Sequence, residues 1–406
     1  MQIAQLQGAG GTERPAFEDI MTRVAALGPR IAERAQTIDE EQRVSDETMS
    51  ELRETGLFKA MQPARFGGYE YPPSALAQVG FELGRHCGST GWCGTLAVCF
   101  GWMTAFYPLE AQQEVWDDPD NLLAVSYLPT QKVEPVDGGY MVSGSWPWAS
   151  GVDSAAWMIL AGLVPDGAGE GRPMLSWFLA PVKELTIDHD SWKVAGLQGT
   201  GSKTVHLTEP LFIPEHRRLP IAAIMSGNVP GKDIPDNPQA QYTYPTFGPT
   251  ALVSPVVGMA QGAVDAFTEI AAGATRIARP GVFEKVAESK LIQRLVGKSA
   301  AHVDAARTMM LTSLQEGETT LQNGGTLSVE QRTRIRRNHG FAGRTSAEVT
   351  NELYNKSGVS AAGLEYRVQR FWRDANTAAT HSSIDTDMLY EMYGTQKLGL
   401  EPAGIF

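Results

Sequence analysis

The residue types with the clearest chemical use lie between positions 140 and 202. Residues 146–151 read Trp-Pro-Trp-Ala-Ser-Gly, so two tryptophans flank a proline and lead into a small turn that bears a hydroxyl. Residues 196–202 read Gly-Leu-Gln-Gly-Thr-Gly-Ser. Backbone N–H groups and a serine hydroxyl beside flat aromatic surface suit a planar ligand with a polar edge, such as an isoalloxazine ring. An ordinary strand with core tryptophans and a glycine-rich hairpin accounts for the same residues.

Motifs of several other chemistries are absent from the sequence. There is no Gly-x-Gly-x-x-Gly after an expected strand, no Walker A loop and no Gly-x-Ser-x-Gly elbow. No group of His, Cys and Asp has the spacing of metal ligands, so we expect no metal site. Cys87, Cys93 and Cys99 are six residues apart and are expected to be buried free thiols. What remains is chemistry in which a bound cofactor does the difficult step and the protein orients it.

The composition is that of an ordinary globular protein of two or three domains, with 406 residues, 42% hydrophobic and 20% charged. The net charge of −12 argues against nucleic acid or an anionic membrane as the main partner. No apolar run approaches the roughly 18 residues that span a bilayer. The N-terminus lacks the basic and apolar regions of a signal peptide, so we expect a cytoplasmic protein.

The hydrophobic periodicity changes twice along the chain. From about 15 to 116, apolar residues such as Ile20 and Val24 recur at spacings of three and four, which indicates helices. From about 122 to 214, short apolar or alternating runs punctuated by Gly, Pro and Asp indicate strands. Residues 220–245 are rich in Pro, Gly and Asn and are expected to form a long loop.

Beyond residue 247 the pattern is helical again. The helices are expected at about 249–276, 285–316, 328–357 and 360–379. We therefore predict an α+β protein with an all-α domain at 1–120, a β domain at 121–220 and an α-helical bundle domain at 221–406.

The order of these domains resembles the acyl-CoA dehydrogenase fold, with a central β-barrel or sandwich and a C-terminal four-helix bundle. Several motifs are similar to those of one branch, the oxygenase components of p-hydroxyphenylacetate hydroxylase and of steroid-degrading phenol hydroxylases. They are Phe-Gly-Gly at 66–68, Ser-Thr-Gly-Trp at 89–92, Pro-Leu-Glu-Ala-Gln at 108–112, the runs at 146–151 and 196–202, Gln-Arg-Phe-Trp-Arg-Asp at 369–374, and His381. The resemblance covers about 15–400.

The resemblance implies a two-component flavin-dependent monooxygenase. Such an enzyme takes reduced flavin, FMNH2 in preference to FADH2, from a separate NAD(P)H-flavin reductase. It binds O2, forms a C4a-hydroperoxide and transfers one oxygen to an aromatic or polyketide-like substrate. The family closes its flavin site with a neighbouring copy, so a homotetramer is also implied.

Four residues near the motifs are implied to contact the flavin. Trp92 would lie against the isoalloxazine, and Trp148 would supply flat surface beside it. Ser126 and Ser150 would hydrogen-bond the polar edge of the ring, where a hydroxyl near N5 prevents the loss of H2O2. A purely structural role is the alternative for each residue. Trp92 could pack in the core, and each serine could hydrogen-bond to the backbone of its own turn.

Three further residues are implied to reach the flavin phosphate or ring edge. Arg276, which the pattern puts at the end of a long helix, would be a charge-assisted donor, with Arg279 as a weaker substitute. Gly358 and Ser360, just before an expected helix, would present N–H groups at its N-terminus. A charge at a helix C-terminus is the structural alternative for Arg276.

The substrate side of the site is implied by His381. In the family a histidine here faces the substrate, and imidazole can take or donate a phenol proton near neutral pH. Arg370 and Asp374, at i and i+4 of the preceding helix, are expected to form a salt bridge. The family usually has a histidine where this chain has Phe100, which implies a more apolar pocket and leaves room for a larger aromatic, a polyketide or heteroatom oxidation.

The main alternative is an acyl-CoA dehydrogenase with tightly bound FAD. Its catalytic base would be Glu391, in a stretch that loosely resembles a Tyr-Glu-Gly-Thr element but is interrupted by Met392 and Tyr393. A non-catalytic flavin- or ligand-binding protein of the same fold is a second alternative. His381 and the Trp-Pro-Trp run favour the monooxygenase.

Overall fold

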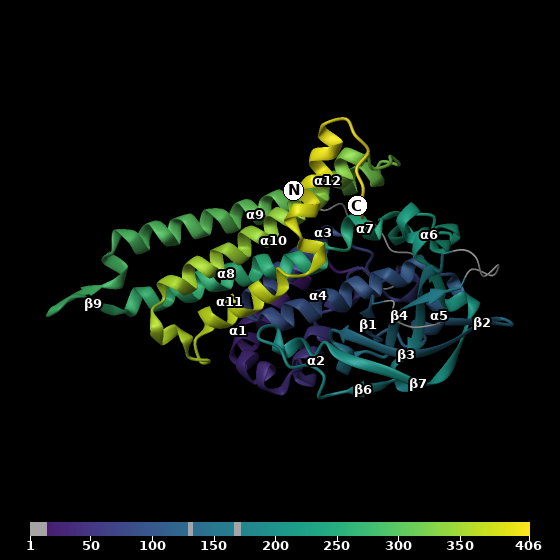
Figure 1. The fold of residues 1–406 in the computed structure, drawn as a ribbon, viewed down its shortest axis with the longest axis horizontal. Helices are drawn as coiled ribbons and strands as arrows, with labels where there is room; N and C mark the ends of the chain where they lie inside the picture. Colours follow the sequence, from purple (N-terminus) through teal and green to yellow (C-terminus); the bar gives the residue numbers. More distant parts are fainter. Residues whose placement is uncertain (1–13, 129–132, 166–171) are drawn as a thin grey trace.

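The computed structural model describes residues 14–128, 133–165 and 172–406. Helices at the N-terminal end, two sheets and a long helical bundle follow one another along the chain (Figure 1). The expected α+β architecture is confirmed. The exact domain limits at 120 and 220 remain a prediction.

The N-terminal part contains five α-helices, of which α4 is buried along its whole length. They are α1 Phe17–Glu41, α2 Asp46–Glu54, α3 Ser74–His86, α4 Gly88–Met103 and α5 Leu109–Val115. The apolar stripe of α1 is buried as the periodicity predicted, with Ile20 and Ile31 fully covered. Every residue of α4 is buried, because it is apolar on all sides and runs through the core.

Two four-stranded sheets pack face to face beside α4. One contains β1 Leu123–Ser126, β4 Trp157–Val164, β5 Met174–Pro181 and β8 Arg218–Pro220, in that order. The other contains β2 Val133–Val136, β3 Gly139–Ala149, β7 Lys203–Pro214 and β6 Thr186–Asp188. Side chains such as Val142, Trp146, Met158 and Phe178 fill the space between the sheets. The strands are those that the alternating runs predicted, and their packing as two sheets agrees with the central barrel or sandwich that the resemblance implied.

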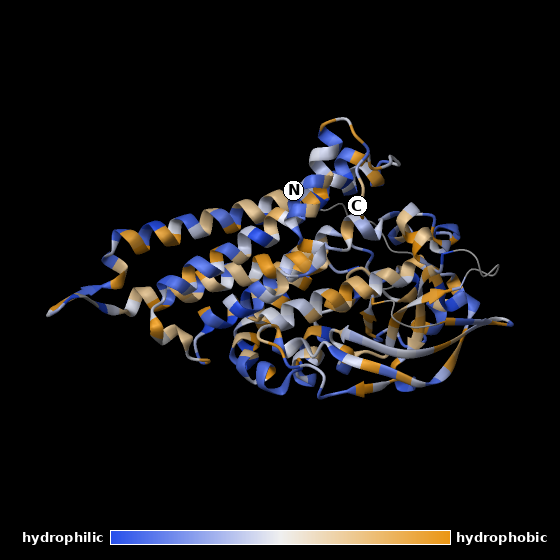
Figure 2. Cartoon of the chain, in the orientation of Figure 1, coloured by the Kyte–Doolittle hydropathy of each residue, from blue (hydrophilic) through white to orange (hydrophobic). Residues whose placement is uncertain are grey.

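The bundle consists of long helices that lie side by side in Figure 1. They are α8 Thr250–Gly273, α9 Lys290–Gln322, α10 Val329–Lys356 and α11 Arg367–Ala378, followed by α12 Thr386–Lys397 against α10. Figure 2 shows hydrophilic and hydrophobic residues alternating along the outer helix α9. The inner helix α8 packs tightly on α3, because a Cβ at Gly84 would come within 2.4 Å of the Pro255 carbonyl oxygen.

Among the residues that the structure describes, one helical stretch is long and apolar enough to cross a membrane by length and composition. It spans Tyr244–Gly273, but 89% of its most apolar window is buried inside the protein. The expectation that no segment approaches such a length is therefore corrected. The stretch is a core helix of the bundle.

Several element boundaries differ from the sequence expectation, including α9, which begins at Lys290 and ends at Gln322 instead of spanning 285–316. Residues 220–245 are not a plain loop, because α6 Ile221–Ser226 and α7 Tyr244–Phe247 lie at its two ends. The helix expected at 249–276 ends at Gly273 and is followed by the hairpin of β9 Thr275–Arg279 and β10 Val282–Lys285, which turns at Pro280 and Gly281. The helix expected from 360 begins only at Arg367, and the sequence reading had not separated α12.

Candidate functional site

The two tryptophans of the 146–151 run have opposite environments. Trp146 is fully buried between the sheets, and its indole N–H donates to the Ala161 carbonyl at 2.7 Å. Trp148 is 61% exposed and has a left-handed φ of 63° at a bulge in β3. A non-glycine residue in this region costs about 1–3 kcal/mol and marks a functional turn when the surroundings enforce it. Trp146 is therefore an ordinary core residue of its strand. Trp148 is the tryptophan whose flat indole surface is available to a ligand.

Hydrogen bonds on both sides hold the Trp148 turn. The Ser126 hydroxyl at the end of β1 donates to the Pro147 carbonyl at 2.6 Å. The Ser150 backbone N–H donates to the Trp148 carbonyl at 2.9 Å. Ser126 is itself buried, so its proton supports the turn that displays the indole.

Ser150 is the point where three elements meet. The Trp92 indole N–H, from the first turns of α4, donates to its hydroxyl oxygen at 3.3 Å. The same oxygen lies 2.6 Å from the Ser202 hydroxyl, which lies 2.7 Å from the Thr200 hydroxyl. The two sequence runs at 146–151 and 196–202 are thus brought into contact, with Trp92 between them and the helical part.

His381 lies on the other side of Trp92. Their ring centroids are 6.2 Å apart, in an edge-on arrangement. The Nδ1 atom of His381 accepts from the Ser383 backbone N–H at 3.1 Å, so the neutral ring carries its proton on Nε2. Burial lowers the pKa of His381, and the Arg336 guanidinium lowers it further. The ring is neutral at neutral pH, with Nε2–H as a donor.

A buried cation behind His381 was missed by the sequence reading. Arg336 on α10 is 2% exposed and donates to the Ser383 carbonyl at 3.4 Å. It also contacts His339, whose Nε2 lies 3.0 Å from the Thr250 hydroxyl. Burial lowers the pKa of Arg336 to about 10 and that of His339 well below its ordinary value. The sequence signal that could have revealed this buried cation is the pair Arg336 and His339, two basic residues on the buried face of a helix.

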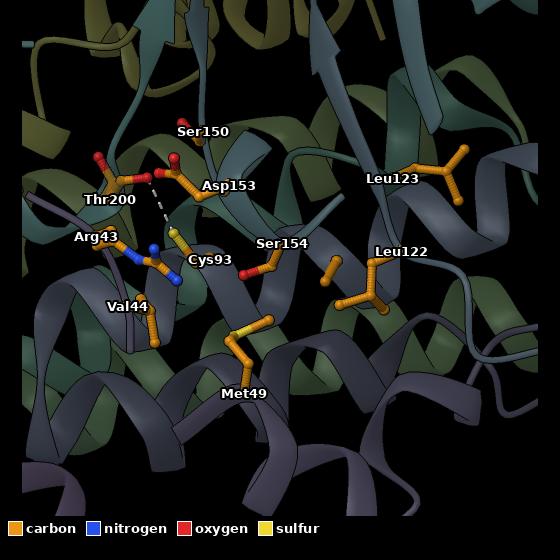
Figure 3. A pocket seen from close by; sticks show the side chains of 12 residues that line it. Arg43, Val44, Met49, Cys93, Leu122, Leu123, Ser150, Asp153, Ser154 and Thr200 are labelled. Atoms are coloured by element: carbon orange, nitrogen blue, oxygen red, sulfur yellow. Dashed lines mark hydrogen bonds between the residues drawn. The ribbon is translucent and has the colours of Figure 1, made fainter. Parts of the chain in front are cut away.

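A small cavity lies behind the Ser150 turn (Figure 3). Its volume is about 20 Å³, and Cys93, Asp153 and Thr200 are among its lining residues. The Cys93 thiol donates to the Thr200 carbonyl at 3.4 Å, the dashed line in Figure 3. This volume holds about one water molecule, so the cavity is not the place of a ring-sized ligand.

Comparisons with known proteins identify the family of the chain. Residues 19–117 match the acyl-CoA dehydrogenase N-terminal domain, and 250–386 match the acyl-CoA dehydrogenase C-terminal domain. The chain is 35% identical to the flavin-dependent monooxygenase oxygenase subunit HsaA of Rhodococcus jostii, over 94% of this chain and 98% of that protein. It is 36% identical to the FADH(2)-dependent resorcinol hydroxylase oxygenase component of a Rhizobium, over 95% of each.

The solved structures give the same result. The HsaA monooxygenase of M. tuberculosis superposes with a TM-score of 0.88 at 32% identity, over 96% of this chain and 99% of that chain. The chain belongs to the flavin-dependent monooxygenases of the acyl-CoA dehydrogenase fold. It is an oxygenase component of the two-component type that hydroxylates aromatics, as the motifs implied.

The residues of this oxygenase component fit a reduced flavin on their own chemistry. Trp148 offers an exposed indole, and the Ser150 oxygen lies beside it on the same turn. Glu391, the base of the dehydrogenase alternative, is exposed on α12. The three cysteines are buried free thiols, with the pKa of Cys87 raised to about 11 by burial. No group of His, Cys, Asp and Glu side chains placed to hold a metal ion occurs among the described residues.

Arg276 is not brought to this turn within the chain. It lies on β9, beyond the end of α8, in a hairpin that projects from the end of the bundle opposite the sandwich (Figure 1). Its guanidinium pairs with Glu284 and donates to Ser289 at 3.1 Å. The expected position at a helix end was wrong, since the chain turns extended after Gly273. Arg279 lies exposed on the same strand.

Gly358 and Ser360 are not at the N-terminus of α11 either. Gly358 has a φ of 80° and precedes the short 3-10 helix Val359–Ala362, whereas α11 begins at Arg367. The side chain of Ser360 lies outside the described residues. Phe100 is buried on α4, two turns after Trp92.

The expected Arg370–Asp374 salt bridge is replaced by contacts to other parts of the fold. Arg370 and Arg373 approach Asp39 of α1, at 3.6 and 3.2 Å. Asp374 accepts from the Leu197 backbone N–H at 2.7 Å. These side chains therefore join the bundle to α1 and to the 196–202 loop, because both partners lie closer than the next turn of the same helix.

Proposed function

We propose that this oxygenase component binds reduced flavin against the Trp148–Ser150 turn and hydroxylates an aromatic or polyketide-like substrate that lies between the flavin and His381. The observation that carries the proposal is the meeting of Trp92, Ser150 and His381 from three separate elements. When bound, the reduced flavin supplies the activation of O2. The side chains of the protein bind the flavin and the substrate, orient them, and exclude water from the site.

On the flavin side, Trp148 and Trp92 provide aromatic surface and Ser150 meets the N5 edge of the ring. Ser126 does not contact the flavin in this proposal. Its hydrogen bond to the Pro147 carbonyl holds the turn and so positions the Trp148 indole. The Ser150 hydroxyl would hold the proton at N5 of a bound flavin, which would favour oxygen transfer to substrate over the loss of H2O2.

On the substrate side, the Nε2–H of His381 donates to the hydroxyl oxygen of a phenol. Accepting a proton at Nε2 would require the other tautomer, which breaks the bond from the Ser383 N–H. His381 therefore orients the phenol and stabilises negative charge on its oxygen, with the buried Arg336 adding a fixed positive charge behind it. Phe100 makes the pocket apolar, which suits an extended aromatic or polyketide-like substrate.

The assembly that we propose is a homotetramer in the cytoplasm. The hairpin of β9 and β10 and the 358–362 turn both connect helices at the same end of the bundle, far from the Trp148 turn of their own chain. Arg276, Gly358 and Ser360 can therefore serve only the flavin of a neighbouring copy. A separate reductase supplies the flavin, as the component names of the relatives indicate.

The identity of the flavin is the finer question. The sequence resemblance favours FMNH2, whereas the resorcinol hydroxylase relative is named for FADH(2). Binding of photoreduced FMN and FAD, measured side by side without oxygen, decides between them.

The proposed reaction is tested with chemically reduced flavin in place of the reductase. The purified protein is mixed with reduced FMN or FAD, oxygenated buffer, and resorcinol or 4-hydroxyphenylacetate, and both hydroxylated product and H2O2 are measured. We expect wild type to form product from at least one aromatic. Ser150→Ala should bind reduced flavin but release more H2O2 per product. Release of all oxygen as H2O2 across a broad phenol panel would refute the hydroxylase proposal.

A further inference from the structure

Ser150 is the end of a chain of hydroxyl contacts that leads to one backbone carbonyl. The Thr200 hydroxyl lies 2.8 Å from the Leu197 carbonyl oxygen and 2.7 Å from the Ser202 hydroxyl. The Ser202 hydroxyl lies 2.6 Å from that of Ser150. We call Thr200, Ser202 and Ser150 the hydroxyl chain.

The direction of every hydrogen bond in the hydroxyl chain follows from its end. Two oxygens at 2.6–2.8 Å need a proton between them, and each hydroxyl has one. The Leu197 carbonyl can only accept, so Thr200 donates to it. Ser202 must then donate to Thr200, and Ser150 must donate to Ser202.

The remaining partner of Ser150 agrees with this direction. The Trp92 indole N–H can only donate, and it does so to the Ser150 oxygen at 3.3 Å. The Ser150 hydroxyl thus donates its proton to Ser202 and accepts from Trp92 with one lone pair of its oxygen. The second lone pair of the Ser150 oxygen is left for a ligand.

We propose that the hydroxyl chain fixes Ser150 as a hydrogen-bond acceptor toward its ligand, and that Asp374 is a positioning residue which holds the Leu197 end of the chain. The proposal rests on the flavin site proposed above. Reduced flavin carries a hydrogen on N5, and oxidised flavin carries a lone pair there. A serine oxygen that can only accept therefore selects the reduced ring, which is the form that a separate reductase delivers.

The Leu197 anchor is held in an unusual conformation. Leu197 has a left-handed φ of 56°, and its N–H donates to the Asp374 carboxylate at 2.7 Å. Asp374 is fully buried on α11. The carboxylate thereby sets the plane of the peptide next to the carbonyl that accepts from Thr200.

The loop around this anchor has no room to shift. A Cβ at Gly196 would lie 2.3 Å from the Arg373 carbonyl oxygen, and one at Gly199 would lie 2.2 Å from Ile38 Cγ2. Close backbone approach to α11 on one side and α1 on the other therefore defines the loop. The direction of the Ser150 hydroxyl is consequently decided by elements of both helical parts.

The first test uses the flavin-free protein. Thr200→Val keeps the shape of the side chain but removes the hydroxyl, and Thr200→Ser keeps the hydroxyl as a matched control. Without Thr200 as acceptor, the Ser202 proton turns to the free lone pair of Ser150, which changes the acceptor that the Trp92 indole N–H contacts. We expect the Trp92 indole ¹⁵N–¹H resonance, assigned with Trp92→Phe, to shift in Thr200→Val and to stay in Thr200→Ser. An unchanged resonance in a folded Thr200→Val protein overturns the proposed direction.

The second test measures the dissociation constants of reduced and oxidised FMN and FAD, without oxygen. Wild type should prefer the reduced form, and Thr200→Val should reduce that preference roughly 3- to 10-fold, as one hydrogen bond allows. Thr200→Ser should retain it. Asp374→Ala should lose the preference, whereas Asp374→Asn, which keeps an acceptor for the Leu197 N–H, should restore it.

The outcomes separate this proposal from the flavin proposal. If Thr200→Val weakens both flavin forms by the same factor, the hydroxyl chain only shapes the loop and the acceptor role is wrong. If wild type binds neither flavin form while the Trp92 resonance still responds as expected, the hydrogen-bond direction stands. In that case the flavin site, and the redox preference built on it, are refuted.

Discussion

Two regions that the sequence resemblance assigned to the flavin differ sharply in how they are held. The Trp148–Ser150 turn is tied to β1, α4 and the 196–202 loop by hydrogen bonds between residues far apart in the chain. The β9–β10 hairpin is held mainly by its own residues, with Arg276 paired to Glu284 and Phe283 69% exposed. The Trp148–Ser150 turn is preorganised within one chain. The β9–β10 hairpin has few such contacts, so its role depends on the molecule that it contacts.

The difference indicates that the two regions have different roles in the proposed binding of flavin. In the proposed flavin site, the contacts at the ring edge would be built into the protomer, where buried hydrogen bonds are strong and specific. The proposed contacts to the flavin phosphate would come from an exposed hairpin, because charge attraction tolerates looser geometry. Mutations in the two regions should accordingly have different kinds of effect.

The largest effect is expected at the substrate side of the tied region. His381→Ala removes the donor to the phenol oxygen and should lower the rate of hydroxylation on the order of 10²-fold. Reoxidation of the reduced flavin should keep nearly its normal rate, because oxygen activation needs no group at this position. His381→Asn should recover substrate binding better than turnover. Normal hydroxylation with slow flavin reoxidation would instead assign His381 to the flavin site or the scaffold.

A smaller effect is expected from crowding the loop. Gly199→Ala places a methyl group against Ile38 and should lower the free energy of unfolding by about 1–3 kcal/mol and weaken reduced-flavin binding. Gly273→Ala, at the base of the hairpin, meets nothing within 4 Å and is the matched control. Denaturant titration of both variants measures the contrast. Equal stability would show that the loop relaxes more easily than its contacts indicate.

The hairpin should show an effect that depends on assembly. Arg276→Ala should weaken reduced-flavin binding roughly 3- to 10-fold, as the loss of one solvent-exposed hydrogen bond predicts, while the unfolding free energy stays within about 0.5 kcal/mol. Light scattering should give a tetramer for both proteins. A monomeric wild type at micromolar concentration would count against the neighbour-copy role, as would unchanged affinity in the tetramer.

The smallest effect concerns pH. Burial lowers the pKa of His381, so its neutral form persists as the pH falls below the ordinary value of about 6.5. Hydroxylation should therefore hold steady from pH 8 to 6.5 and decline only below that range, as His381 becomes protonated. A decline centred above pH 6.5 that disappears in His381→Asn would contradict the lowered pKa.

The sequence by itself determined the order of the parts and most element types, because hydrophobic periodicity is a local property of the chain. The apolar stripe of α1, the alternating strands and the long helices followed from it, and the short motifs led to the correct family. Short elements near Pro and Gly, such as the β9–β10 hairpin and α12, carried too weak a period to be recognised.

The tertiary structure alone decided which polar atoms meet. Trp146 and Trp148 are two residues apart and look alike in sequence, yet a bulge buries one and exposes the other. Asp374 was expected to pair along its own helix, but the 196–202 loop brings a backbone N–H closer. The Ser150 contacts join residues 52 and 58 positions apart, and their direction depends on a carbonyl in another loop. Such hydrogen bonds depend on packing between distant elements, which no local pattern encodes.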